Sequence, residues 1–202
     1  MDKKILITGA SGLLGQALVT HFIKEGFHVV AQYHSHQPFS NPQCTWLYAD
    51  FSNLEGIRHF LQHNKNVISQ CAYLINNYGP ITNKDTVELR AEDFLHDYHH
   101  NVITAFEITQ FLLKAGALKK VVNIGFEFVG ENRAYRKIVT YAAAKNALSL
   151  MTQALQLQYP QVQFIIEPLR TLENAEVSPK GHQIISPETA AGEIYKKLFC
   201  ES

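Results

Sequence analysis

Three glycines recur at every third position close to the beginning of the chain: Gly9, Gly12 and Gly15. They stand between an apolar, β-branched run at residues 5–8 and a segment of helical period at residues 13–24, and a second β-branched run follows at residues 28–33. These patterns predict a strand, a helix and a strand in succession. Because strands joined through a crossover helix cannot form a hairpin, the two strands are expected to pair in parallel.

The alternation of strands and helices continues along the chain. Further strands are expected at residues 45–48, 72–76, 120–124 and 162–167. Further helices are expected at residues 54–62, 91–115 and 141–159, and after Pro187. The sequence therefore predicts an α/β fold, a doubly wound parallel sheet of the Rossmann type with six strands. Since 202 residues suffice for one substantial core and no linker interrupts them, residues 1–202 are expected to form a single domain.

Charge and composition narrow the class of protein. The 18 Lys and Arg residues balance the 18 Asp and Glu residues, and no segment concentrates the basic ones, which excludes the basic patch of a nucleic-acid-binding protein. The three cysteines are too few and too far apart for a disulfide framework or a metal knuckle. No apolar run has the length of a signal peptide or a membrane span. We therefore expect a cytoplasmic protein that acts on a small molecule, without nucleic acid or a membrane.

The glycine positions have a mechanical reason in a strand-to-helix turn. Gly9 permits a tight turn, Gly12 lets backbone amides approach a diphosphate, and Gly15 lets the helix pack close to the strand. The helix N-terminus adds partial positive charge, so an anion is bound without a basic side chain. The residues expected to contact the diphosphate of a dinucleotide are Gly9, Ser11, Gly12, Leu13 and Leu14. A Walker loop is excluded because no Lys follows, and a purely structural turn is the alternative.

The end of the second strand bears on the choice between NAD and NADP. Sites for NAD place an acidic residue about 20 residues after the glycines, where it bonds the ribose 2′-hydroxyl. Here residues 32–36 carry no carboxylate. Because His34 and Ser35 can donate to a 2′-phosphate, NADP is favoured as the coenzyme and NAD is the second choice. The alternative is that His34 and His36 are ordinary solvated loop residues.

Four further motifs follow along the chain. They are Asp50 after the third strand, Asn76-Asn77-Tyr78-Gly79 after the fourth, Asn101 inside a helix, and Tyr141 four residues before Lys145. With the glycine turn they make the chain resemble the short-chain dehydrogenase/reductase (SDR) family over residues 4–199. Residues 33–35 and 49–52 most resemble the pteridine reductase and dihydromonapterin reductase branch. The resemblance implies that Asp50 and Phe51 contact adenine, that Asn77 and Gly79 flank the adenosine ribose, and that Pro168 lies beside the nicotinamide.

Tyr141 and Lys145 lie on one face of a helix at this spacing. The ordinary pKa of a phenol, about 10, is too high for easy proton exchange near neutrality, and a neighbouring ammonium lowers it. The pair therefore predicts that Lys145 lowers the pKa of Tyr141. The resemblance implies further that Tyr141 is the proton donor in hydride transfer, that Lys145 bonds the nicotinamide ribose, and that Asn101 holds a water in a proton relay. In isolation, such a pair is alternatively a helix-start aromatic and a solvated cation.

The chain departs from the family pattern in two places. The family carries a Ser thirteen residues before the Tyr, whereas residues 125–128 read Gly-Phe-Glu-Phe and the stretch up to Tyr141 is two residues longer. Glu127 is the candidate catalytic substitute, because a carboxyl group both orients a pterin and relays a proton; a surface Glu between core phenylalanines is the alternative. We also expect the closing seventh strand of the family to be missing and residues 170–186 to form a short substrate lid.

Three functions are compatible with these motifs. The first is an NADPH-dependent reductase that transfers hydride to a small carbonyl or pterin-like substrate. The alternative, favoured by Phe126 and the short lid, is a non-catalytic NAD(P)-binding sensor or scaffold of the same descent. A third is an epimerase or dehydratase of the extended family branch, indicated by the glycine spacing, although the chain is short for that branch.

The histidines at positions 96, 99 and 100 form a separate cluster, in which His96 and His100 share a helix face. Their spacing suits zinc, but no acidic or thiol residue has an obvious claim to complete a site, so we expect no metal and favour a polar face or a subunit contact. In the family this helix commonly forms a dimer interface. The resemblance therefore implies a homodimer or a homotetramer.

Overall fold

The computed structural model describes residues 3–35, 39–126, 137–169, 172–173 and 184–200. Within these ranges one sheet contains six strands: β1 (Lys4–Ile7), β2 (His28–Tyr33), β3 (Cys44–Tyr48), β4 (Tyr73–Asn76), β5 (Lys120–Ile124) and β6 (Gln163–Glu167). All neighbouring strands are parallel, in the order β3-β2-β1-β4-β5-β6. The order reverses between β1 and β4, so the carboxyl ends of these two strands border the crevice in which such sheets bind ligands. The predicted α/β fold is confirmed.

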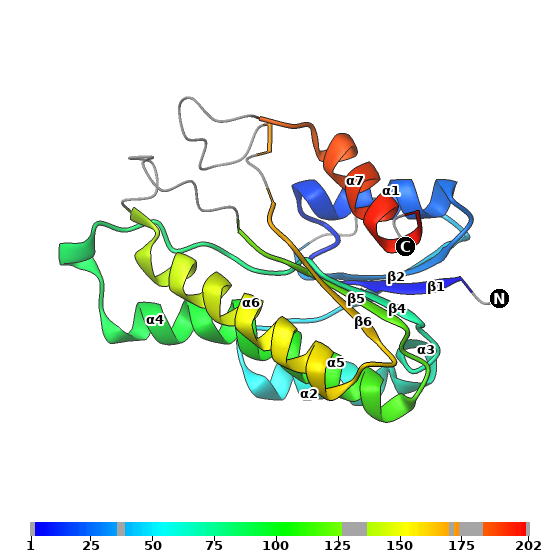
Figure 1. The fold of residues 1–202 in the computed structure, drawn as a ribbon, viewed down its shortest axis with the longest axis horizontal. Coiled ribbons are helices and arrows are strands. Elements are labelled where there is room, and N and C mark those ends of the chain that lie inside the picture. Colours follow the sequence, from blue (N-terminus) through cyan, green and yellow to red (C-terminus); the bar gives the residue numbers. More distant parts are fainter. Residues whose placement is uncertain (1–2, 36–38, 127–136, 170–171, 174–183, 201–202) are drawn as a thin grey trace.

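Helices cover both faces of the sheet (Figure 1). One face carries α1 (Leu13–Lys24) and α7 (Pro187–Phe199). The other carries α2 (Leu54–His63), α4 (Ala91–Tyr98), α5 (Thr104–Ala115) and α6 (Val139–Gln158). The short helix α3 (Lys65–Ile68) and the 3-10 turn η1 (Thr86–Glu88) lie in the connections and were not expected from the sequence.

The central strands are buried on both faces, which is why they are apolar without alternation. In β1, Ile5 and Ile7 pack toward α1 and α7, whereas Leu6 packs toward the opposite helices. An aromatic cluster closes the α1–α7 layer, where the ring of Phe22 lies 5.1 Å from that of Phe27 and 5.7 Å from that of Tyr195. This cluster joins the last described helix to the first βαβ unit.

Local chemistry sets several helix boundaries. The side chain of Asn53 caps α2 by accepting the backbone N–H of Gly56 at 2.9 Å. Ser186 caps α7 by accepting the N–H of Thr189 at 3.1 Å, and Pro187 occupies the first helical position, where a missing N–H costs nothing. Helix α5 ends at Ala115, and Gly116, which follows it, has a φ of +79°, a left-handed conformation that favours glycine.

The long helix expected at residues 91–115 is interrupted. Between α4 and α5 lies a π-helical turn, η2 (His99–Ile103), which contains Asn101. Two side chains take backbone carbonyls there: Asn101 Nδ2 donates to the carbonyl of Asp97 at 3.0 Å, and Thr104 Oγ1 donates to that of His99 at 3.0 Å. Side chains that bond nearby carbonyls compete with the α-helical ladder, and π-turns of this kind frequently mark functional sites.

No helix in the described part of the chain combines the length and the apolar character needed to cross a bilayer.

Replacing Phe22 by Ala tests the α1–α7 layer. Phe22 has no exposed surface and lies at the centre of the aromatic cluster, so Phe22→Ala should lower the free energy of unfolding by about 3–5 kcal/mol. Val87→Ala, at a side chain that is 91% exposed in η1, should change it by less than about 0.5 kcal/mol. Urea unfolding followed by circular dichroism measures both, and equal effects would contradict the assignment of Phe22 to the core.

Candidate coenzyme and catalytic site

The turn between β1 and α1 has the geometry that its glycines predict. Gly9 adopts a φ of +60°, and a Cβ there would lie 2.9 Å from the Cα of Tyr78. A Cβ on Gly15 would lie 2.2 Å from the carbonyl oxygen of Gly9, so only glycine lets α1 pack this close to the turn. No side chain caps α1 at Gly12, and its first turn carries no acidic residue. The first amides of α1 are therefore left for an external anion.

The other predicted diphosphate contacts lie at the same turn. Leu13 is exposed and Ser11 is half-buried, whereas the side chain of Leu14 is buried in the core. Any contact of Leu14 with a diphosphate therefore uses its backbone.

Gln32 holds the turn in place and was not identified from the sequence. Its side chain is 1% exposed; Oε1 accepts the N–H of Gly9 at 2.8 Å, and Nε2 donates to the carbonyl of Ala49 at 2.9 Å. One amide thus fixes the loop after β1 to the loop after β3. The available signal was a polar residue inside the otherwise apolar run at residues 28–33.

The loop after β4 is fastened to the same turn. Asn77 Nδ2 donates to the carbonyls of Thr8 and Gly9, at 3.1 and 2.9 Å. The backbone N–H groups of Asn77 and Tyr78 both donate to Thr8 Oγ1 at 3.1 Å. The structure therefore brings Gly9, Asn77 and, two residues further on, Gly79 to one edge of the sheet.

The carboxyl ends of β2 and β3 bring His34 beside Asp50. His34 Nε2 lies 3.9 Å from Asp50 Oδ1, and its ring stacks on Tyr48 with 6.0 Å between centroids; Ser35 is exposed next to it. A hydrogen bond from the backbone N–H of Ser52 lowers the pKa of Asp50. Phe51 differs from the expectation for a ligand-facing side chain, because it is 2% exposed and its carbonyl accepts His99 Nε2 at 3.0 Å.

Between β4, η2 and α6 the structure brings together three of the predicted site residues, Gly79, Asn101 and Lys145. A Cβ on Gly79 would lie 2.3 Å from Asn101 Oδ1 and 3.2 Å from Lys145 Nζ. Asn101 Nδ2 donates to the carbonyl of Pro80 at 3.1 Å, whereas its buried Oδ1 has no hydrogen-bond partner among the described residues. Lys145 Nζ donates to the carbonyl of Ile124 at 2.7 Å and lies 5.4 Å from the centre of the Tyr141 ring. A free amide oxygen, an ammonium group and a phenol thus share one site.

The expected lowering of the Tyr141 pKa by Lys145 does not occur in this structure. Burial raises the pKa of Tyr141, and the negative charge of Asp97 raises it further. Burial also lowers the pKa of Lys145 to about 7, so its ammonium is only partly populated near neutrality and is a weaker source of positive charge. The phenol is held in its protonated form.

A cavity of about 470 Å³ opens beside this group. Its lining is mainly apolar and consists of Gly125, Phe126, Ala142, Ala143, Lys145, Asn146, Ser149, Ile166 and Pro168. Phe126 occupies the position at which the resemblance predicts Ser. Its ring packs edge to face against the Tyr141 ring, with 5.7 Å between the centroids. Glu127 and His36 lie outside the described residues.

The histidine cluster is held by protein contacts. Tyr78 Oη lies 2.9 Å from His100 Nδ1, and the rings of His96 and His100 are 4.3 Å apart. Burial lowers the pKa of His100 to about 4. No group of three His, Cys, Asp or Glu side chains in the described ranges is arranged to hold a metal ion.

The chain is similar in sequence to a known family of proteins. The family model described as short chain dehydrogenase matches residues 3–167. The chain is 24% identical over 165 residues to CDP-abequose synthase of Salmonella muenchen, covering 82% of this chain and 52% of that protein. It is also 24% identical over 170 residues to the short-chain dehydrogenase/reductase FrzI of Cladobotryum sp, covering 76% of this chain and 63% of that protein. The chain thus spans about half to two thirds of the length of these curated relatives.

Among solved structures, a short chain dehydrogenase from Leptospira borgpetersenii with bound NAD+ superposes with a TM-score of 0.84 at 20% identity. The match covers 97% of this chain and 85% of that chain. At this identity the likeness supports the fold.

Titration of Lys145 makes stability depend on pH. Because its folded pKa of about 7 lies below the ordinary value, the unfolded chain binds one more proton between pH 7 and about 10, so stability rises with pH across that window. Lys145→Met removes this dependence. The free energy of unfolding of the variant, minus that of the unaltered chain, should be largest below pH 7. This difference should shrink toward pH 10, by at most about 1.4 kcal/mol per pH unit. Urea unfolding at several pH values measures the difference, with Lys114→Met, a loss of charge at an exposed helix position, as control. A difference that does not vary with pH would contradict the buried titration.

Proposed function

Because this chain belongs to the short-chain dehydrogenase family, we propose that it is an NADPH-dependent reductase that transfers hydride to a small carbonyl or pterin-like substrate. The observation that carries this proposal is the meeting of Gly79, Asn101 and Lys145 beside Tyr141, at the same edge of the sheet as the glycine turn. The resemblance of residues 33–35 and 49–52 to the pteridine reductase branch supports the pterin-like class of substrate.

The residues present fit a nicotinamide dinucleotide. The uncapped start of α1 suits the diphosphate, bound at Gly9, Ser11, Gly12, Leu13 and Leu14. Asp50 and the backbone of Phe51 would hold the adenine, and Asn77 and Gly79 would flank its ribose. Lys145 would bond the nicotinamide ribose, with Pro168 beside the ring. A Cβ on Gly79 would reach Asn101 and Lys145, so glycine at this position keeps space between the loop and these side chains.

NADP is preferred over NAD in this proposal. His34 and Ser35 are exposed at the end of β2, where NAD sites carry a carboxylate. The carboxylate of Asp50 lies 3.9 Å from His34 Nε2, and a protonated His34 would offset the repulsion between that carboxylate and a 2′-phosphate.

The chain's own residues supply the proton and the alignment. Tyr141 is the proton donor, since burial and the charge of Asp97 keep its phenol protonated. Lys145, partly deprotonated near neutrality, and Asn101, whose Oδ1 is free to accept a hydrogen bond, form the route by which the phenol regains a proton. Glu127 remains the proposed substitute for the missing Ser. NADPH, when bound, supplies the hydride.

A second function, a non-catalytic NAD(P)-binding sensor or scaffold, is favoured by one observation. Phe126 packs against Tyr141 where a hydroxyl would polarise a substrate carbonyl. If the chain is such a sensor or scaffold, it binds the coenzyme without oxidising it.

We further propose that the chain assembles as a homodimer or a homotetramer. Large apolar side chains are exposed on α4 and α6, which lie side by side: Phe94, Leu95, Tyr98, Leu150 and Leu157. Exposed patches of this kind are typical of subunit contacts.

The two functions differ in the effect of Tyr141→Phe. If the chain is a reductase, the substitution should lower turnover by about 100-fold or more and leave NADPH affinity within about twofold, because only the transferred proton is lost. Loss of NADPH absorbance with dihydropterins, ketones and aldehydes measures turnover, and protein fluorescence measures binding. Tyr159→Phe, at the tyrosine that follows the last residue of α6, is the control. NADPH binding without oxidation of any of these substrates would overturn the reductase and favour the sensor.

A further inference from the structure

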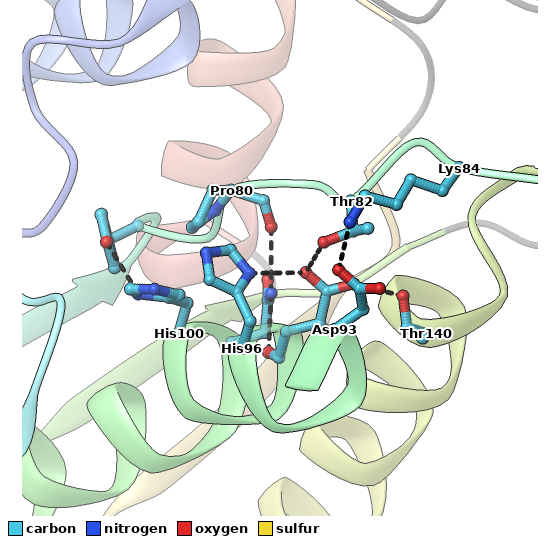
Figure 2. A network of polar contacts seen from close by, with 10 residues as sticks. Pro80, Thr82, Lys84, Asp93, His96, His100 and Thr140 are labelled. Atoms are coloured by element: carbon cyan, nitrogen blue, oxygen red, sulfur yellow. Dashed lines mark hydrogen bonds and ion pairs between the residues drawn. The ribbon is translucent and has the colours of Figure 1, made fainter. Parts of the chain in front are cut away.

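A carboxylate lies fully buried behind the proposed site. Asp97, in the last turn of α4, has no exposed surface. Its Oδ1 accepts a hydrogen bond from Thr82 Oγ1 at 2.7 Å and lies 3.3 Å from His96 Nδ1, and its Oδ2 accepts one from Thr140 Oγ1 at 2.6 Å. Figure 2 labels Thr82, His96 and Thr140, and its dashed lines mark these three contacts. Burial of an ion costs several kcal/mol unless its hydrogen bonds are satisfied, so these contacts hold Asp97 where it is.

The two threonines belong to segments on either side of the site. Thr82 lies in the loop after β4, which also supplies Gly79 and Pro80, and Thr140 immediately precedes Tyr141 on α6. The backbone N–H of Lys84 donates to the carbonyl of Lys137 at 2.8 Å, a second link between the same segments. Asp97 therefore joins, through a single side chain, the loop that borders the coenzyme position to the turn that carries the phenol.

Asp97 is also connected to the proposed relay. Its backbone carbonyl accepts Asn101 Nδ2 at 3.0 Å, and the same Nδ2 donates to the carbonyl of Pro80 at 3.1 Å. A shift of Asp97 would move both Asn101 and the start of α6.

We propose that Asp97 is a positioning residue for proton transfer: its carboxylate ties the loop after β4 to the first turn of α6 and thereby holds the phenol of Tyr141 in place. This assignment rests on the proposed reductase function for its effect on turnover. The tie itself rests on the hydrogen bonds alone.

The charge of Asp97 supports this role. Among the described residues, the titratable groups near it are His96 and His100 on its own helical segment and Tyr141 on α6. The loop after β4 bonds it through the uncharged Thr82 hydroxyl, and Lys84 of that loop is paired with Asp93. Because a negative charge raises the pKa of a phenol, Asp97 favours the protonated form of Tyr141, which is the form that donates in a reduction.

Asp97→Asn removes the charge and keeps the shape, and Asp93→Asn is the matched control. Asp93 lies one turn earlier on α4 and bonds Lys84 Nζ at 2.6 Å and the N–H of Arg90 at 2.9 Å, and within the described ranges it has no hydrogen bond to α6. With NADPH and a substrate that is turned over, Asp97→Asn should lower kcat about tenfold or more while KM for NADPH stays within about twofold. Asp93→Asn should leave both within about twofold. If Asp97→Asn does not fold, Thr140→Val, which removes one arm of the tie, should give the same selective loss of kcat.

A second readout does not require turnover. Difluorotyrosine placed at position 141 reports the titration of that phenol through its fluorine NMR signal. Asp97→Asn should move the midpoint to lower pH, because a charge that disfavours the phenolate is lost, and Asp93→Asn should not. If none of the tested substrates leads the unaltered chain to oxidise NADPH, the reductase proposal fails. The titration midpoint of the phenol alone then decides the role of Asp97. An unchanged midpoint, or a kcat for Asp97→Asn within about twofold of the unaltered chain, overturns the assignment.

Discussion

Parallel pairing of β1 with β4 is the constraint on which the rest of the structure depends. It places the loops after the two strands side by side at the point where strand order reverses, although 69 residues separate Thr8 from Asn77. The hydrogen bonds of Asn77 to Thr8 and Gly9 then fix the two loops to each other. Neither loop could approach so closely if Gly9 carried a side chain, because its Cβ would meet the backbone of Tyr78.

The candidate site contains polar side chains whose burial, taken alone, would destabilise the fold. Lys145, Asn101, Asp97 and Gln32 are all nearly fully buried, and each is engaged by specific partners. Gln32 bonds the glycine turn, and Asp97 bonds Thr140, which immediately precedes Tyr141. The exception is Asn101 Oδ1, which has no partner in the described ranges and so stays available to a ligand or a water.

Most of the fold could be predicted from periodicity, because each strand contains an apolar run and most of the crossovers contain a helical repeat. The interruption at η2 could not, since it depends on side chains of Asn101 and Thr104 taking carbonyls that a regular helix would use. Family motifs pointed to Gly79, Asn101, Tyr141 and Lys145, which the structure places close together. The direction of the Tyr141 pKa was wrong, because it depends on burial and on Asp97, which is 44 residues away along the chain and contributes only through the packing of α4 on α6.

Calorimetric titration of NADPH and NADH tests most directly whether the glycine turn binds a dinucleotide. The account predicts saturable binding of NADPH, weaker binding of NADH, and loss of both in Gly15→Ala, whose Cβ would lie 2.2 Å from the Gly9 carbonyl oxygen. Gly192→Ala in α7, where a Cβ meets only His21 at 3.7 Å, should bind as the unaltered chain does. Absence of heat with either coenzyme at about millimolar concentration, at which even an interaction of about −4 kcal/mol is detectable, would contradict the account.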